Sequence, residues 1–384
     1  MRTPGSSEPG APAPPGAAGR SGTTGRLRTP GLVDQHCHGF SGVDFATAPV
    51  ASVRDAVREL FLNGVTRVVA SLPTLSRDET LAAVRRLAPL VREGVLAGLH
   101  LEGPFLAGAR CGAQSPADLL DPADPDSHRW LSGVLQAGRD GGEQVIVAMT
   151  YAPELAGAAA VEDALAAHGV LACPGHTDAT ATELGAALDR WADQSRVSGH
   201  GNQSSHTRPD PDRTPAVTHL FNAMRGFHHR EPGPVPLLLR AATEGRLRVE
   251  LIADGHHVDP GVVVDLLALA PSAVCVVSDA SAATGAPEGA YTLGGVGIEA
   301  RSAAADGAPR LVGSSTMASG AVQLDGALRN LLRWGVPLPA ALAAVSTTPA
   351  RTLPAHRRDA GWVEWVTDPE TGSIAPGRPA VVVP

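Results

Sequence analysis

The stretch LVDQHCHG, residues 32–39, starts as a short apolar run and ends in two histidines. Side chains two positions apart on a strand point to the same face, so His36 and His38 are expected to share a face and Cys37 to point away from them. This pair could bind a metal ion or simply be hydrogen-bonded at a strand end. The stretch predicts a buried strand with polar chemistry at its C-terminal end.

Seven more apolar runs follow the first one, which covers residues 32–38; they lie at residues 65–72, 94–102, 144–151, 169–176, 216–222, 247–254 and 273–279. Stretches with helical periodicity lie between them, at residues 50–62, 80–92, 116–137, 156–167, 179–191 and 260–269. Eight strands that alternate with helices predict a closed (β/α)8 TIM barrel. The active site of such a barrel lies at the C-terminal ends of its strands.

The composition excludes several classes of function. The chain has 384 residues, a net charge of −8 and 43% hydrophobic residues, which is enough for one large domain with a real core. All 31 basic residues are arginines, because the sequence contains no lysine. Schiff-base aldolases, pyridoxal phosphate enzymes, Walker-A nucleotide sites and metal centres bridged by a carboxylated lysine are therefore excluded. The negative net charge argues against a nucleic-acid partner.

The sequence predicts a soluble, cytoplasmic protein without a membrane partner. No apolar run reaches the roughly 18 residues needed to span a bilayer, and the N-terminal residues contain no apolar core of a secretory signal. The four cysteines are scattered and form no CxxC pair, which is typical of free thiols in a reducing compartment.

Composition also divides the chain. Residues 1–30 are rich in Pro, Gly, Ser and Ala and are predicted to form a disordered arm. Residues 31–352 contain the predicted barrel. Within it, the polar segment 192–215 is longer than an ordinary connection between a helix and a strand. It is predicted to be a mobile insertion, and it carries His200 and His206.

Polar residues of metal-binding type follow several of the predicted strands. Glu102 ends the run at 94–102, His176 ends the run at 169–176, and His219 lies in the run at 216–222. Each of them alone could be an ordinary hydrogen-bonded strand end. Together, at one mouth of one barrel, a Glu and two His supply three ligands and leave a position open for water, which is the pattern of a catalytic metal site.

Asp279 follows the last apolar run. A buried aspartate beside a cation stays ionised, so it could accept a proton from water and return it to a leaving group. The alternative is that Asp279 caps the helix that follows.

These motifs resemble a known family. The chain carries DQHCHG (34–39), LHLEGPF (99–105), PGHTDAT (174–180), THLFNAM (218–224), HHREPG (228–233), ELIADGHHV (250–258) and VVSDASAATG (276–285). In this order they resemble the N-acetylglucosamine-6-phosphate deacetylase family of the amidohydrolase superfamily. The resemblance runs from Gly31 to about Gly377, and THLFNAM and ELIADGxHV are its most specific motifs.

The resemblance implies roles for residues of the metal and catalytic centre. It implies that Asp279 is the general base and acid. It implies that a divalent cation (zinc, iron, manganese or cobalt) is held by three residues, Glu102, His176 and His219. It also implies that His36 and His38 mark the place where some members bind a second metal ion, so that each subunit holds one or two.

The resemblance also implies contacts to a phosphorylated amino sugar. Asn222 and Ala223 would contact the sugar and His257 the substrate, while Arg230 would reach the phosphate across the interface of a homodimer. A planar guanidinium suits a phosphate dianion, although Arg230 could instead form a surface ion pair. The backbone of the segment Leu311, Val312 and Gly313 would lie near the substrate.

The sequence departs from the family pattern in three places. Gln114 stands where members have a histidine that polarises the amide carbonyl, and an amide can donate a hydrogen bond but cannot carry a positive charge. Ala283 stands where many members have proline. The chain ends predict a reduced or missing small β-sandwich, with residues 353–384 as its remnant.

Three functions are consistent with these observations. The first is metal-dependent hydrolysis of N-acetylglucosamine 6-phosphate to glucosamine 6-phosphate and acetate. The second is the same chemistry on another N-acyl substrate, which Gln114 and the insertion at 192–215 suggest. The third is a sugar-phosphate-binding protein without activity, against which Asp279 argues, because a binding protein needs no general base.

Overall fold

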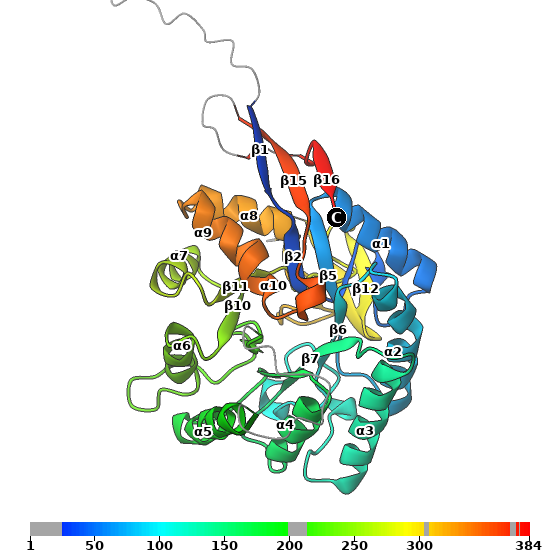
Figure 1. Ribbon diagram of the computed structural model, residues 1–384, viewed down its shortest axis with the longest axis vertical. Coiled ribbons are helices and arrows are strands. Elements are labelled where there is room, and N and C mark those ends of the chain that lie inside the picture. The colour runs from blue at the N-terminus through cyan, green and yellow to red at the C-terminus, as the bar shows by residue number, and fades with distance from the viewer. Residues whose placement is uncertain (1–24, 199–212, 303–306, 369–373, 376) are drawn as a thin grey trace, which may run out of the picture.

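Parallel strands form the centre of the molecule, and helices surround them (Figure 1). The computed structural model describes residues 25–198, 213–302, 307–368, 374–375 and 377–384, with only the backbone for 192–198. One parallel sheet contains β2 (Leu32–Cys37), β5 (Val65–Leu72), β6 (Gly98–Glu102), β7 (Ile146–Tyr151) and β8 (Leu171–Pro174), in that order. A second one contains β9 (Ala216–Val217), β10 (Arg248–Ile252) and β11 (Val274–Val277).

Hydrogen bonds at both junctions join the two sheets into one barrel. The N–H of Thr218 donates to the carbonyl of Pro174 at 2.9 Å, and the N–H of Asp279 donates to the carbonyl of His36 at 3.0 Å. All eight expected strands are therefore present, and the predicted (β/α)8 class is confirmed.

The helices cover the outside of the barrel (Figure 1). They include α1 (Val50–Leu62), α2 (Arg77–Arg92), α3 (Pro125–Arg139), α4 (Ala158–Ala167), α5 (Ala181–Ser198), α6 (Val235–Thr243), α7 (Pro260–Leu269), α8 (Leu324–Arg333), α9 (Leu338–Leu342) and α10 (Thr348–Ala350). In α1 the buried residues are Val53, Ala56, Val57 and Leu60, the spacing of one apolar face packed on a core. No helix in the described part of the chain is both long and apolar enough to cross a membrane.

The two ends of the chain form a small antiparallel sheet, in the order β1 (Gly25–Pro30), β15 (Trp362–Thr367) and β16 (Val381–Val383). Residues 25–30 were expected to belong to a disordered arm, and for them this prediction is wrong; residues 1–24 lie outside the described residues. The sequence GRLRTP has a single aliphatic residue, so its strand character comes from pairing with β15, more than 300 positions away.

The predicted insertion starts later than expected. Helix α5 continues past Trp191 to Ser198, so residues 192–198 are helical and not part of a loop. The sequence of residues 192–198 is mostly polar and does not show apolar residues at helical spacing, but it includes no glycine or proline that would end the helix. Residues 199–212, with His200 and His206, lie outside the described residues.

A three-stranded hairpin sheet was not expected from the sequence. It contains β12 (Gly289–Leu293), β13 (Val296–Ala300) and β14 (Arg310–Leu311). Gly294 and Gly295 form its turn with φ of +56° and +87°, which suits a tight hairpin. The sheet buries Leu293 and Ile298 against Ala113 and Ala283, next to the C-terminal ends of the barrel strands.

Candidate active site

Glu102, His176 and His219 form the first pocket at the C-terminal mouth of the barrel. Oε1 of Glu102 lies 3.0 Å from Nε2 of His176 and 2.9 Å from Nε2 of His219, and the two nitrogens are 3.1 Å apart. All three side chains are buried. The structure therefore brings together the three ligands expected for the principal metal.

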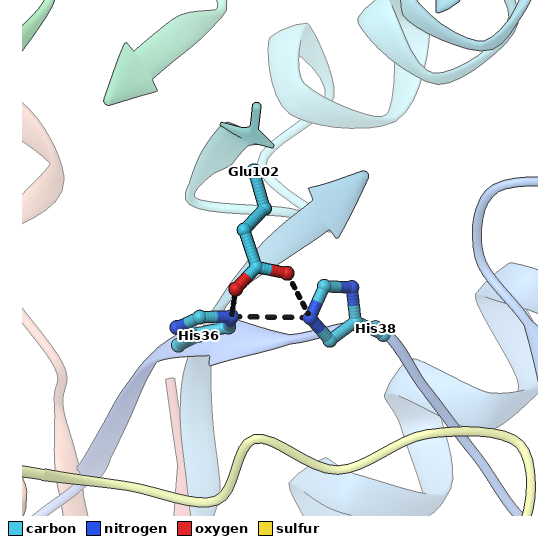
Figure 2. Close-up of side chains that lie close together, drawn as sticks. All are labelled: His36, His38 and Glu102. Carbon is cyan, nitrogen blue, oxygen red and sulfur yellow. Dashed lines mark hydrogen bonds and ion pairs between the residues drawn. The ribbon is translucent and has the colours of Figure 1, made fainter. Parts of the chain in front are cut away.

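His36 and His38 form a second pocket with the same glutamate (Figure 2). Their Nε2 atoms are 3.1 Å apart, and Nε2 of His38 lies 3.2 Å from Oε2 of Glu102. Nε2 of His36 lies 3.7 Å from Oε1 of the same carboxylate. The Glu102 carboxylate thus lies between the two pockets and contacts both.

Hydrogen bonds decide which ring nitrogen of three histidines carries the proton. Nδ1 of His36 faces Oε2 of Glu250 at 3.0 Å, Nδ1 of His38 faces the carbonyl of Ser71 at 3.1 Å, and Nδ1 of His176 faces the carbonyl of Arg110 at 2.8 Å. Carbonyls and ionised carboxylates only accept hydrogen bonds, so each Nδ1 must donate. In the neutral rings the Nε2 lone pairs therefore converge, which is unfavourable unless a cation lies among them.

The donor set fits a divalent metal ion. Tetrahedral zinc, with bonds of about 2.0–2.1 Å, holds its ligand atoms roughly 3.3 Å apart, close to the separations in both pockets. Burial lowers the pKa of His36, but the negative charges around it, that of Asp279 foremost, outweigh burial and raise it to about 10. The same competition raises the pKa of His38 to about 9. In the first pocket, burial lowers the pKa of His219, but its hydrogen bond to Glu102 and the charge of that carboxylate outweigh burial and raise it. Both pockets therefore favour positive charge.

Asp279 lies against the second pocket. Its Oδ1 is 3.5 Å from Nε2 of His36 and 3.4 Å from Nε2 of His38. Burial raises the pKa of Asp279, but the charge of His36 and the hydrogen bond from His38 outweigh it and hold the pKa below its ordinary value. The carboxylate is therefore ionised and able to accept a proton, and it does not act as a helix cap in the structure.

Strained backbone marks the same region. Six non-glycine residues of the described chain have φ between +27° and +79°, and the site region holds five of them: His176, His219, Phe221, Ala223 and Asp279. Such conformations cost of order 1–3 kcal/mol each and persist where the surrounding structure holds them in place. The strand ends are shaped to aim these side chains inward.

Gln114 contacts Glu102 directly. Its Oε1 accepts a hydrogen bond from the N–H of Thr74 at 2.7 Å, and its Nε2 donates to Oε2 of Glu102 at 2.5 Å. Gln114 was expected as a donor to the substrate carbonyl. In the structure Gln114 holds the Glu102 carboxylate in place, and its NH2 group has a second hydrogen beyond the one that it donates to Glu102.

The expected sugar contacts flank the first pocket. Asn222 and Ala223 come three and four positions after His219, and Nδ2 of Asn222 donates to the carbonyl of His219 at 3.3 Å. A Cβ placed on Gly112 would lie 3.5 Å from Cε1 of His176 and 3.7 Å from Cβ of Ala223, so the segment that carries Gln114 passes beside both.

His257 and its neighbours form the next part of the rim. Nδ1 of His257 donates to Oδ2 of Asp254 at 2.7 Å, which leaves its Nε2 for another partner. Leu311, on β14, packs on the apolar cluster beneath the hairpin sheet, whereas Val312 is 59% exposed and Gly313 adopts φ +72°. Arg230 is exposed on the segment after Ala223, where it contacts no pocket residue of the same chain.

Sequence reasoning missed two buried polar residues inside the barrel. Glu250, on β10, contacts His36, and His100, on β6, faces the hydroxyls of Ser71 at 2.9 Å and Thr150 at 2.7 Å. The signal was a polar residue within an otherwise apolar strand, in VELI for Glu250 and GLHLE for His100. Inward-facing positions of a barrel alternate with outward ones, so both residues could have been placed in its interior.

Known proteins resemble this chain over most of its length. N-acetylglucosamine-6-phosphate deacetylase from Homo sapiens is 32% identical over 340 residues, which covers 85% of this chain and 75% of that protein. The enzyme of the same name from Vibrio furnissii is 30% identical over 84% of this chain and 73% of its own length. N-acetylgalactosamine-6-phosphate deacetylase from Escherichia coli O157:H7 is 30% identical over 93% of this chain and 83% of its own.

A solved structure is also similar to this chain. A mutant N-acetyl-D-glucosamine-6-phosphate deacetylase from Mycobacterium smegmatis, in complex with N-acetyl-D-glucosamine-6-phosphate, superposes with a TM-score of 0.77 at 33% identity, over 97% of this chain and 89% of that one. No family model matches the sequence. From the relatives and from the site geometry, we conclude that this chain belongs to the N-acetylglucosamine-6-phosphate deacetylase family.

Proposed function

We propose that this protein hydrolyses the acetamide of N-acetylglucosamine 6-phosphate to glucosamine 6-phosphate and acetate. The observation that carries the proposal is the convergence of histidine Nε2 atoms on Glu102, with the ionised Asp279 beside them. The names of the relatives support the substrate.

Glu102, His176 and His219 would hold the principal metal ion, and His36 and His38 would hold a second one with Glu102. A bound divalent cation polarises the amide carbonyl and makes water a better nucleophile. Histidine and carboxylate ligands suit zinc, iron, manganese or cobalt.

Asp279 would carry the proton during the reaction. It accepts a proton from the water that attacks the carbonyl carbon, and it returns that proton to the sugar nitrogen as the C–N bond breaks, so acetate and a free amine leave. Since the carboxylate is ionised before the reaction, it starts in the form that this role requires.

The rim residues would orient the sugar. With Nδ1 of His257 committed to Asp254, its Nε2 is left to face a sugar hydroxyl. We place Asn222, Ala223 and the segment Leu311–Gly313 along the sugar. We also propose a cytoplasmic homodimer in which the exposed Arg230 binds the phosphate of the partner's substrate; four free cysteines support the reducing compartment.

A second candidate substrate is the epimer, N-acetylgalactosamine 6-phosphate. The relative named for that substrate matches 93% of this chain. The two sugars differ only in the orientation of one hydroxyl, so the same metal and the same Asp279 serve both.

Acetate release tests the proposal. The purified protein is assayed with both acetylated sugar phosphates before and after chelation, and metal content is measured on the same samples. We expect release that the chelator abolishes, and Asp279→Asn to lower kcat roughly 100- to 10,000-fold while the metal stays bound. The exposed Asp55→Asn serves as control. Full activity of Asp279→Asn would refute the assigned role, and no release from metal-loaded wild type would refute the substrate.

A further inference from the structure

Glu250 is a buried carboxylate inside the barrel, below the two pockets. It is 5% exposed and lies in the middle of β10, with the apolar Val249 and Leu251 on either side. It lines a cavity of about 20 Å³ together with Gln35, Thr218 and other residues. A buried carboxylate is costly unless hydrogen bonds and nearby positive charge compensate it, so its presence calls for an explanation.

One carboxylate group joins a ligand of each pocket. Oε2 of Glu250 accepts from Nδ1 of His36 at 3.0 Å and from the backbone N–H of His219 at 3.2 Å. Oε1 accepts from Nε2 of Gln35 at 2.6 Å, and Oε1 of Gln35 in turn accepts from the hydroxyl of Thr352 at 3.0 Å. These bonds fix the orientation of the carboxylate.

His36 differs from the other histidines in how it is held. Backbone carbonyls hold His38 and His176 through Nδ1, and no side-chain replacement removes them. His36 depends on a side chain, that of Glu250. A carboxylate on the second nitrogen fixes the tautomer of a metal-binding histidine and strengthens its lone pair, and loss of such a partner typically costs 10- to 100-fold in metal affinity.

The charges of the site favour the same conclusion. Glu102, Asp279 and Glu250 together carry three negative charges when ionised, all of them buried. One divalent cation neutralises only two of them. A second cation, in the pocket nearest to Asp279 and Glu250, removes the remaining negative charge.

We propose that Glu250 is the positioning residue for the second metal ion: through His36 it sets the affinity of the pocket formed by His36, His38 and Glu102. The inference rests on the proposed metal-dependent function. It concerns metal affinity, which is measured independently of turnover.

Zinc titration of the apoprotein tests the inference. We expect wild type to bind two equivalents per subunit. Glu250→Gln keeps the shape of the side chain, but its NH2 group takes the place of an oxygen that accepts hydrogen bonds, so it faces a donor and one of these bonds is lost. We expect this variant to bind the first equivalent as wild type does and the second 10- to 100-fold more weakly. Glu162→Gln is the matched control, because Glu162 is also a buried carboxylate but lies on α4, outside the barrel, bonded to the Tyr151 hydroxyl and to Arg190. It should bind both equivalents normally.

A second variant covers the case in which Glu250→Gln does not fold. Gln35→Leu keeps the carboxylate but removes its Oε1 partner, and a weaker second equivalent is again expected. Two equivalents of wild-type affinity in the folded variants would overturn the inference, as would a wild type that binds only one; both results would leave the deacetylase function standing. A wild type that binds no zinc and shows no chelator-sensitive activity would instead refute the proposed function.

Discussion

At the scale of single residues, Gln114 shows how an amide can stand where the family resemblance predicts a histidine. The N–H of Thr74 needs an acceptor and Oε2 of Glu102 benefits from a donor, and one amide group supplies both. It holds the carboxylate that both pockets share.

Replacing Gln114 with alanine tests this role. We expect Gln114→Ala to weaken metal binding by about 10- to 100-fold, because Glu102 loses the partner that orients it. Calorimetric zinc titration measures the change. Gln136→Ala removes an amide on the outside of α3, where its Nε2 contacts Asp140, and should leave zinc affinity unchanged. If zinc binding by Gln114→Ala equalled that of wild type, the amide would not position Glu102.

Asp254 links the stability of the fold to pH. Burial raises the pKa of Asp254, but hydrogen bonds from the side chain and backbone of His257 and from the N–H of Ala321 hold it well below its ordinary value. A pKa that is lower in the folded protein means that the ionised group stabilises the fold. This contribution is complete above the unfolded pKa of about 3.9 and decreases as the pH falls below it.

Thermal unfolding of Asp254→Asn should show this dependence. The groups that bond to the Asp254 carboxylate are all donors, so the NH2 group of an asparagine at this position must face one of them. We therefore expect the free energy of unfolding to fall by about 1–3 kcal/mol at pH 7. The difference in Tm between wild type and variant should stay constant from pH 7 to 5 and narrow below about pH 4. Asp55→Asn provides the baseline. If the difference in Tm widened as the pH fell, the pKa of Asp254 would not be lowered in the folded protein, and this prediction would be wrong.

Residue patterns predicted which side chains converge at the mouth of the barrel, but not the residues that support them. Glu102, His176 and His219 stand at strand ends, where polar residues are conspicuous, and the barrel brings strand ends together. Glu250 opens the motif ELIADGHHV, but it lies within a strand and the motif does not show which side chain it contacts; Thr74 acts through its backbone and belongs to none of the motifs. Their role depends on which neighbour the closed barrel places opposite them, and that is a property of tertiary structure.

At the scale of elements, strands with local hydrophobic signal were predictable and those made by distant pairing were not. The predicted ranges 65–72 for β5, 50–62 for α1 and 260–269 for α7 match the structure, because each carries its own apolar period. Strand β1 and the short β14 contain little apolar sequence and exist through their partners.

The segment after β14 supports the strand end that carries Asp279. The N–H of Gly320 donates to the carbonyl of Asp279 at 2.7 Å, and a Cβ on Gly320 would lie only 1.9 Å from the carbonyl oxygen of Ser278. Gly320→Ala must therefore displace the backbone at 278–279. Since a displacement of about 1 Å can cost 100-fold in rate, we expect kcat to fall by roughly that factor.

Gly133→Ala is the control for this variant. Gly133 lies within α3, where an added Cβ meets no neighbour within 4 Å, so alanine should stabilise the protein by about 0.4–1 kcal/mol and leave kcat unchanged. Steady-state kinetics and Tm are measured on both variants. Normal kcat in Gly320→Ala would mean that Asp279 tolerates a shifted backbone.

At the scale of the whole molecule, the small sheet of β1, β15 and β16 lies at one end of the molecule (Figure 1), and the candidate site lies at the other end of the barrel strands. Strand β1 leads directly into the N-terminal end of β2, whereas the ligands follow the C-terminal ends of the strands. Trp365 on β15 joins the sheet to the barrel. It is 1% exposed, its Nε1 donates to the hydroxyl of Thr29 at 2.9 Å, and its ring packs on Gly64 before β5.

This separation predicts that stability and chemistry respond independently to a change in Trp365. Trp365→Ala removes a large buried side chain. We expect it to lower the free energy of unfolding by about 3–5 kcal/mol and Tm by several degrees. Metal content and kcat, measured well below the lowered Tm, should remain those of wild type. Trp362→Ala is the control on the same strand, because Trp362 is only half-buried and stacks on Arg28, and it should cost less. A fall in kcat or metal content in folded Trp365→Ala would show that the sheet of the chain ends acts on the site through the barrel, and the independence argued here would be wrong.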